Sequence, residues 1–373
     1  MTERLVIRGG RVIDPSENTD ARVDVFVEDG RISRVASDID TGSARVIDAT
    51  GLVVTPGFVD IHAHLRDPGL EYKEDIESGT RAAARGGFTT ICAMPNTEPA
   101  MDNRATVEYV LRQAAARGLV RVLPIGAVTR GRAGTELAEL GDLADAGCVA
   151  FSDDGAPVYD ATIMRRALEY ASSFDLAIVD HCEEPSLSKD GVMNESWVST
   201  RLGLRGTPAA AEETAVSRDI ALAEATGAHV HIAHVSTRGA IEAIRSAKVR
   251  GVRVTAEVTP HHLTLTDETV AFGAFGGDAL IYETNAKVNP PLRSQSDVDA
   301  CVAALAEGTI DCIATDHAPH ALIEKLCEFD DASFGISGLE TAFGLCMRLV
   351  HEGRIDLPML LERMTFGPSR ALG

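Results

Sequence analysis

The chain lacks paired cysteines and any apolar run long enough to cross a membrane. No apolar run approaches the roughly 18 residues of a membrane span, and the N-terminal segment MTERLVIRGG has no signal-peptide core. Its seven cysteines are scattered and never form a CxxC pair, which favours reduced thiols over a disulfide framework. We therefore expect a cytoplasmic protein.

Positive charge is also scarce. The 35 lysines and arginines stand against 56 aspartates and glutamates, which gives a formal net charge of −21. This balance argues against nucleic acid or an anionic membrane as a partner. It does not exclude a small anionic substrate, because a single arginine can dominate the field inside a cleft.

Aromatic residues make up only 5% of the chain, but its 45% hydrophobic and 24% charged content is that of a globular protein. Residues 1–54 predict a small β module. Its strands are expected in LVIRGGRVID, RVDVFVEDGRISRVA and ARVIDATGLVV, with Asp29-Gly30 as a hairpin turn. Such a short module is marginal as an independent core, so we expect it to pack on the remainder, residues 55–373.

After Val53 the pattern becomes strand, polar tip and helix, repeated eight times. Eight such units predict a (β/α)₈ TIM barrel. An open doubly wound sheet is the alternative, weakened because no glycine-rich phosphate fingerprint follows the first strand. The expected strands are 53–64, 88–96, 120–129, 148–154, 176–182, 229–236, 253–262 and 310–320. The expected helices are 72–85, 103–117, 135–146, 160–173, 208–226, 237–249 and 295–307, with Pro208 at a first helical position and Gly227 as a stop.

Two histidines one residue apart, His62 and His64, close the first predicted strand. Residues two apart on a strand point the same way, so both imidazoles should leave one face together. Two converging imidazoles are typical of half of a zinc site. Arg66 follows as a fixed cation suited to an anionic ligand.

Residues able to bind a metal or a substrate also end other predicted strands. In a barrel these ends meet on one face, where active sites are built. Imidazole and carboxylate ligands suit zinc, with manganese, cobalt or iron as alternatives. The residues are Asn96 after the second strand, Asp153 and Asp154 after the fourth, His181 after the fifth, His234 after the sixth and Asp316 after the eighth.

Several of these residues have a plainer reading. Asp153-Asp154-Gly155 could form a turn or a helix N-cap. Adjacent strand residues face opposite ways, so only one aspartate should bridge two metals, and strand parity does not choose between them. Asn96 could instead form an Asx turn.

Of the other histidines, some are candidates for contact with a ligand and the rest are expected to be structural or exposed. We read His229 and His231 as structural or exposed, because they lie on the opposite strand parity to His234. Either His261 or His262 could support a ligand, and either His317 or His320 could face one. His351 is expected to face solvent, and helix 72–85 to carry ordinary exposed charges.

As an ordered set, the motifs resemble the amidohydrolase superfamily and, within it, the class I dihydroorotases. Hydantoinases and allantoinases resemble the chain less, because they usually place a carboxylated lysine where this chain has FSDDG. The matching segments span residues 55–343 and are TPGFVDIHAHLRDPG, AMPNT, FSDDG, DHCEE, RLGLRGTPAAAEE, HIAHVST, TAEVTPHHL, KVNPPLR, IATDHAPH and FGISGLETAF.

The resemblance implies two zinc ions per subunit and a role for each residue. Asp154 would be the bridging carboxylate, with Asp153 as the fallback. Arg66 and His320 suit a substrate carboxylate, since arginine offers a forked pair of donors. The other implied roles are His62, His64 and Asp316 on the first metal, His181 and His234 on the second, and Asn96 and Asn289 on the substrate.

The implied reaction is the reversible cyclisation of N-carbamoyl-L-aspartate to dihydroorotate in pyrimidine biosynthesis. Two metals would lower the pKa of a bridging water and polarise the ring carbonyl that it attacks. Asp316, as general base, would pass the proton to the departing amide nitrogen. Two alternatives stay open: a hydantoinase or allantoinase type of cyclic amidohydrolase, and a non-catalytic partner of aspartate carbamoyltransferase. A homodimer, or a complex of the active enzyme with that transferase, is also compatible with the resemblance.

Two departures from the family pattern give further expectations. The resembling proteins continue beyond the last helix into strands that complete the N-terminal β-sandwich, so residues 4–54 are expected to lack partner strands. The loop LCEFDDAS lacks a proline that is common after its alanine, and we expect this loop to affect substrate affinity.

Overall fold

The computed structural model describes residues 4–274, 276, 277 and 279–373. Its centre is an eight-stranded parallel sheet in the order β17-β16-β15-β12-β11-β10-β9-β8. A parallel bridge between Ala63 and His317, with His64 N donating to His317 O at 2.8 Å, joins the two edges. The predicted barrel is therefore confirmed. Its strands are β8 (Phe58–Ala63), β9 (Phe88–Ala93), β10 (Arg121–Gly126), β11 (Ala150–Phe151), β12 (Ile178–Asp180), β15 (Val230–Ile232), β16 (Val254–Val258) and β17 (Cys312–Ile313).

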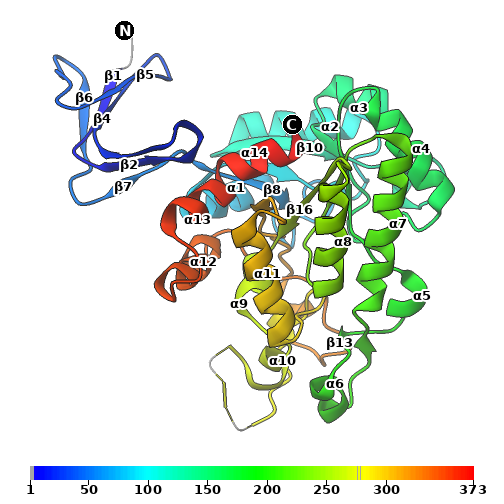
Figure 1. Ribbon diagram of the computed structural model, residues 1–373. Helices are drawn as coiled ribbons and strands as arrows, with labels where there is room; N and C mark the ends of the chain where they lie inside the picture. Colours follow the sequence, from blue (N-terminus) through cyan, green and yellow to red (C-terminus); the bar gives the residue numbers. More distant parts are fainter. Residues whose placement is uncertain (1–3, 275, 278) are drawn as a thin grey trace.

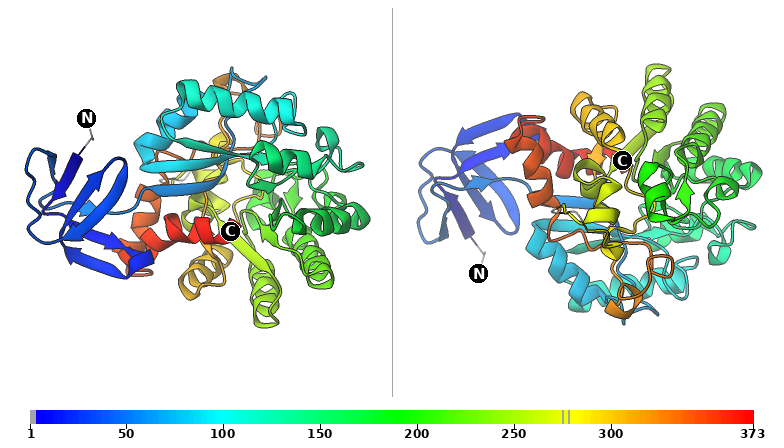
Figure 2. Two further views of the ribbon diagram at one scale, coloured as in Figure 1. Left: turned by 90° about the horizontal axis from the view of Figure 1, so that it is seen from above. Right: turned by 90° about the horizontal axis from the view of Figure 1, so that it is seen from below.

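Helices surround the barrel, as the two end-on views show (Figure 2). Half of the repeating-unit helices begin with a capping side chain that accepts a hydrogen bond from a free backbone N–H, such as Asn103 and Thr237. The helices of the repeating units are α1 (Ile76–Gly86), α2 (Arg104–Arg117), α3 (Leu140–Ala146), α4 (Ala161–Ser172), α7 (Ala210–Thr226), α8 (Arg238–Val249), α11 (Gln295–Glu307) and α12 (Ala342–His351).

Two apolar layers hold the barrel together. The larger lies between strands and helices and includes Phe88, Phe151 and Ile244. The smaller gathers Ile61 of β8, Val179 of β12 and Cys312 of β17, which are far apart in the sheet order, so it fills the barrel interior. Ala371 and Leu372 of α14 (Phe366–Leu372) join this interior cluster and cover one end of the barrel. The open end is therefore the one at which the strands finish.

The N-terminal residues form two small sheets beside the barrel (Figure 1). One has the order β5-β4-β1-β6, and the other β3-β2-β7. Asp29-Gly30 turns between β4 and β5 as predicted, with φ of 52° and 72°. Helix α13 (Leu357–Met364) packs against β2 and so ties the module to the barrel. The strands are β1 (Arg4–Arg8), β2 (Arg11–Asp14), β3 (Thr19–Arg22), β4 (Asp24–Glu28), β5 (Arg31–Ala36), β6 (Arg45–Asp48) and β7 (Val53–Val54).

Several predicted boundaries were wrong. The segment LVIRGGRVID, residues 5–14, contributes to two strands in different sheets, because the chain turns at Gly9, where φ is 76°. The run 53–64 likewise divides into β7 of the module and β8 of the barrel. Residues 253–262 end as a short helix, α9 (Pro260–Thr264), capped by Thr259. Helix α7 begins at Ala210, so Pro208 precedes it, whereas Gly227 does end it with a φ of 69°.

Within the described residues, no helix is both long and apolar enough to cross a membrane.

Candidate metal centre and substrate pocket

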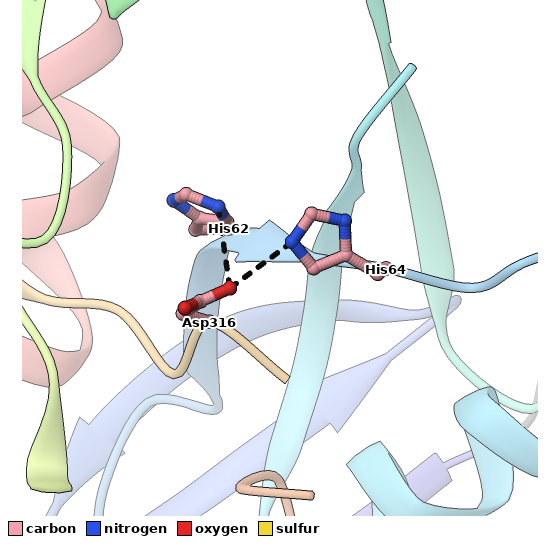
Figure 3. Close-up of side chains that lie close together, drawn as sticks. All are labelled: His62, His64 and Asp316. Atoms are coloured by element: carbon pink, nitrogen blue, oxygen red, sulfur yellow. Dashed lines mark hydrogen bonds and ion pairs between the residues drawn. The ribbon is translucent and has the colours of Figure 1, made fainter. Parts of the chain in front are cut away.

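His62, His64 and Asp316 converge at the open end of the barrel (Figure 3). Asp316 Oδ1 lies 3.5 Å from His62 Nε2 and 3.0 Å from His64 Nε2. Both imidazoles are almost fully buried. They come from the end of β8 and the aspartate from just beyond β17, so closure of the barrel brings them together.

A second group continues the cluster across the barrel. Asp154 Oδ1 lies 3.4 Å from His62 Nε2, 3.4 Å from His234 Nε2 and 3.7 Å from His181 Nδ1. Its other oxygen, Oδ2, is 3.4 Å from His64 Nε2. Asp154 therefore lies between the two histidine pairs, which is the position that a bridging carboxylate needs.

The neighbouring Asp153 faces away from this cluster. Its carboxylate accepts hydrogen bonds from the backbone N–H groups of Val128 and Thr129 and from the Thr129 hydroxyl. The structure thus places Asp154 beside the histidines and gives Asp153 a role in holding the 127–129 turn.

The cluster fits a bound cation. Two buried atoms in it, His62 Nε2 and Asp154 Oδ1, have no hydrogen-bond partner within the described part of the chain. Burial opposes ionisation of Asp154, but the adjacent His62 and His234 side chains hold its pKa well below its usual range. Burial likewise opposes ionisation of Asp316, and His64 lowers its pKa. Such ionised carboxylates among imidazoles are the donor set of a divalent metal.

Three residues at this end of the barrel have a left-handed backbone. Arg66, His234 and Asp316 have φ values of 61°, 32° and 46°. A non-glycine residue in this region costs roughly 1–3 kcal/mol and persists only where the surroundings impose it. At His234 the turn also breaks the alternation of β15, which brings its side chain into the cluster. The prediction that His229 and His231 are structural is confirmed, because they bond to Thr255 and Glu257 and lie outside the pocket lining. The strand parity used for it does not extend to His234.

Glu257 contacts the cluster from within the barrel by a hydrogen bond with His62, and it was not predicted from the sequence. Its Oε1 accepts a hydrogen bond from His62 Nδ1 at 2.6 Å, and its Oε2 lies 3.2 Å from His231 Nε2. Burial opposes its ionisation, but the charge of His62 and hydrogen bonds from His231 and His62 lower its pKa to about 2. An ionised partner at Nδ1 puts the proton of His62 there and leaves Nε2 for a metal. An acidic residue inside the apolar run VTAEV was the signal.

A pocket of about 240 Å³ opens onto the cluster. Arg66 lies on one side, with Nε donating to Pro319 O at 3.2 Å and Nη2 3.5 Å from His320 Nε2. Burial lowers the pKa of His320 to about 4, aided by the charges of Arg66 and Lys73, so this side carries fixed positive charge on the arginine. The pocket is lined by His64, Arg66, Asn96, Asp154, Gly155, His181, Asn289, Asp316, Ala318, His320, Phe334 and Gly335.

The charges at 73 and 74 are not ordinary surface groups, which corrects our reading of 72–85. Lys73 Nζ lies 3.3 Å from His320 Nδ1 and 2.8 Å from Glu324. Glu74 lies 2.6 Å from His317 Nε2. His317 therefore points away from the pocket and His320 lines it.

The other histidines occupy structural positions. His262, which lies on the buried helix α9, forms hydrogen bonds with the Thr259 hydroxyl and with Pro290 O. His261, beside it, is also buried and lies outside the pocket lining. His351 is exposed, as predicted.

A third acidic group, Asp180, Cys182 and Asp219, lies outside the pocket. Arg218 Nη2 is 2.7 Å from Asp219 and 3.7 Å from Asp180. A guanidinium thus occupies the cation position there, and the group ties β12 to α7.

Comparisons with known proteins agree with this geometry. A family model described as dihydro-orotase-like matches residues 51–240. The dihydroorotase of Syntrophotalea carbinolica is 56% identical over 369 residues, which cover 99% of this chain and 85% of the relative. The dihydroorotase of Geobacter sulfurreducens is 54% identical over 370 residues, with the same coverage of both chains.

Among solved structures, the L-hydantoinase (dihydropyrimidinase) of Arthrobacter aurescens matches with a TM-score of 0.86 and 25% identity. The match covers all of this chain and 82% of that one. The D-hydantoinase (dihydropyrimidinase) of a Thermus species matches with a TM-score of 0.81 and 25% identity, over 99% and 82% of the two chains. These solved structures are cyclic amide hydrolases that share the barrel fold of this chain. The identity to the dihydroorotases is far higher and shows that the chain belongs to the dihydroorotase family.

Proposed function

We propose that this protein is a dihydroorotase, which interconverts N-carbamoyl-L-aspartate and dihydroorotate with loss or gain of water. The observation that carries the proposal is one pocket in which a cluster of four histidines and two aspartates adjoins the Arg66 guanidinium. The cluster suits hydrolysis of an amide, and the arginine suits a substrate carboxylate. This reaction belongs to pyrimidine biosynthesis.

We assign two zinc ions to the cluster, with Asp154 between them. His62, His64 and Asp316 would hold one ion, and His181 and His234 the other. Bound there, the two ions supply an activated water and an electrophile that polarises the ring carbonyl. Neutral imidazole and carboxylate ligands favour zinc over calcium or magnesium, which take all-oxygen sites.

The residues of the chain position the substrate and move the proton. Arg66, Asn96 and His320 would bind the carboxylate on one side of the pocket. Asp316, ionised and at the pocket wall, would accept a proton from the attacking water and donate it to the departing amide nitrogen. In the synthetic direction Asp316 would make the reverse transfers.

Other assignments remain predictions of the sequence. The scattered thiols favour a cytoplasmic location, and six of the seven cysteines are buried while Cys327 is exposed. A homodimer or a complex with aspartate carbamoyltransferase is compatible with the family. A non-catalytic scaffold is less favoured, because all six candidate ligands are present. A hydantoinase is less favoured because its ring bears no carboxylate for Arg66.

The proposal is tested by measuring dihydroorotate hydrolysis on the purified chain from the loss of ring absorbance, with bound metal quantified in the same sample. We expect turnover with about two metals per chain, loss of turnover after chelation, and recovery on adding zinc. Full metal occupancy without turnover on dihydroorotate would contradict the proposal and favour a scaffold or another ring.

Glu257→Gln is expected to weaken metal binding by about 10- to 100-fold. The amide oxygen can still accept from His62 Nδ1, but it lacks the negative charge that makes His62 a stronger ligand. Metal affinity is measured by competition with a coloured chelator. Glu340→Gln, which neutralises an exposed carboxylate, is the control and should bind as the wild type does. An unchanged affinity in Glu257→Gln would show that Glu257 only fills space.

A further inference from the structure

Two asparagines face each other across the pocket and are held by different partners. Asn96 follows β9 beside His64, whereas Asn289 lies beside His181, which follows β12. In the sheet order β8 and β9 are neighbours, and β12 is three strands beyond β9. Both side chains line the pocket, so they border its two sides.

Asn96 presents its amino group to the pocket. Its Oδ1 lies 2.7 Å from His64 Nδ1. His64 Nε2 faces Asp316 and Asp154 and is the atom assigned to the metal. The ring proton is therefore on Nδ1, and an oxygen must accept it. Nδ2 of Asn96 is therefore left as a donor on the same side as Arg66.

Asn289 is held the opposite way round. Its Nδ2 lies 2.6 Å from Glu183 Oε2 and 3.2 Å from His181 Nε2. A carboxylate only accepts hydrogen bonds, so the Asn289 atom facing it must be nitrogen. No described protein group donates to Asn289 Oδ1, which is left as an acceptor.

We propose that Glu183 is a positioning residue that fixes Asn289 Oδ1 as an acceptor for a substrate N–H, opposite the donors that bind the carboxylate. This inference rests on the proposed function. In the six-membered ring of dihydroorotate, the imide nitrogen lies directly across from the carbon that bears the carboxylate. With the carboxylate on Arg66 and Asn96, the imide N–H points towards Asn289. The pocket thus selects a ring with an anion at one end and an N–H donor at the other.

The test compares dihydroorotate with its analogue methylated on the imide nitrogen, both as competitive ligands of the metal-loaded enzyme. A methyl group removes the donor and leaves Oδ1 unpaired, so the wild type should bind the analogue roughly 10- to 100-fold more weakly. Asn289→Ala should reduce this discrimination to a few-fold, because the acceptor is absent and space is available. Retained discrimination in Asn289→Ala would overturn the proposal.

Two substitutions of Glu183 separate positioning from simple structure. In Glu183→Gln the amide oxygen can replace Oε2 towards His181 and Asn289, while its nitrogen faces Ser188, so discrimination should persist. In Glu183→Ala Asn289 is free to turn, and discrimination should fall as in Asn289→Ala. Equal discrimination in the alanine and glutamine variants would exclude the positioning role. Metal content and melting temperature are recorded for each variant to check that it is folded and loaded with metal. The readout for positioning is the ratio of the two affinities.

The two proposals fail in distinguishable ways. If the wild type with full metal occupancy does not hydrolyse dihydroorotate, the proposed function is wrong. If the wild type hydrolyses it and Asn289→Ala discriminates as before, only the assignment of Asn289 and Glu183 is wrong.

Discussion

Asp316→Asn is expected to lower kcat for dihydroorotate hydrolysis by about 10²- to 10⁴-fold while most of the metal is retained. The asparagine oxygen can still act as a ligand at the position 3.0 Å from His64 Nε2. It cannot accept and return a proton, because an amide has no basic site in the neutral range. The expected change is therefore in kcat, with a much smaller change in metal content.

The measurement combines steady-state kinetics with metal analysis of the same preparation. Asp331→Asn provides the control, since it removes an exposed carboxylate from the loop next to the pocket and should leave kcat within about twofold, as for other surface changes. An Asp316→Asn enzyme that kept more than a tenth of the wild-type kcat would rule out Asp316 as the general base. Loss of metal together with activity would instead assign Asp316 a ligand role alone.

Arg66→Ala should raise KM for dihydroorotate by roughly 10²- to 10³-fold, the usual loss when one partner of a buried charge pair is truncated. Arg66 is only 7% exposed, and the backbone at φ 61° directs its guanidinium beside His320. Arg66→Lys should lie between wild type and alanine, because it keeps the charge and loses the forked geometry.

Dihydrouracil, the same ring without the carboxylate, supplies the matched comparison. Its weaker hydrolysis should change by no more than a few-fold in Arg66→Ala, because it offers nothing to the guanidinium. If both substrates lost the same factor, Arg66 would be supporting the fold of the pocket. If uncharged rings were hydrolysed best by wild type and variant alike, a hydantoinase activity would replace the proposed one.

Much of the architecture follows from patterns that are local in the chain. Hydrophobic residues recur with period two in strands and 3.6 in helices, so each element can be recognised by itself. Eight repeats of a strand followed by a helix are compatible with few sheet topologies. Barrel geometry then places every strand end on one face. That is why His62, His181 and Asp316, which are scattered in sequence, could be predicted to meet, and the structure brings them together.

The choice between Asp153 and Asp154 as the residue beside the histidines depended on a contact with another segment, which the local sequence pattern does not reveal. Asp153 is held by the backbone after β10, which leaves Asp154 to face the histidines. In the same way, the left-handed turn at His234 reverses the direction that strand parity predicts. A single residue outside the strand conformation is enough to invert such an argument, and no glycine or proline lies next to His234 in the sequence to indicate the turn.

The supporting groups could not be foreseen for a related reason. Glu257 reaches His62 across 195 residues of sequence, and Lys73 reaches His320 across 247. The residue types and their order along the chain specified the barrel and its candidate metal-binding histidines, because periodicity and strand-end position are properties of short segments. Which carboxylates orient those histidines, and which way each asparagine faces, was settled by contacts between distant segments, because a hydrogen-bond partner exists only once the barrel has closed.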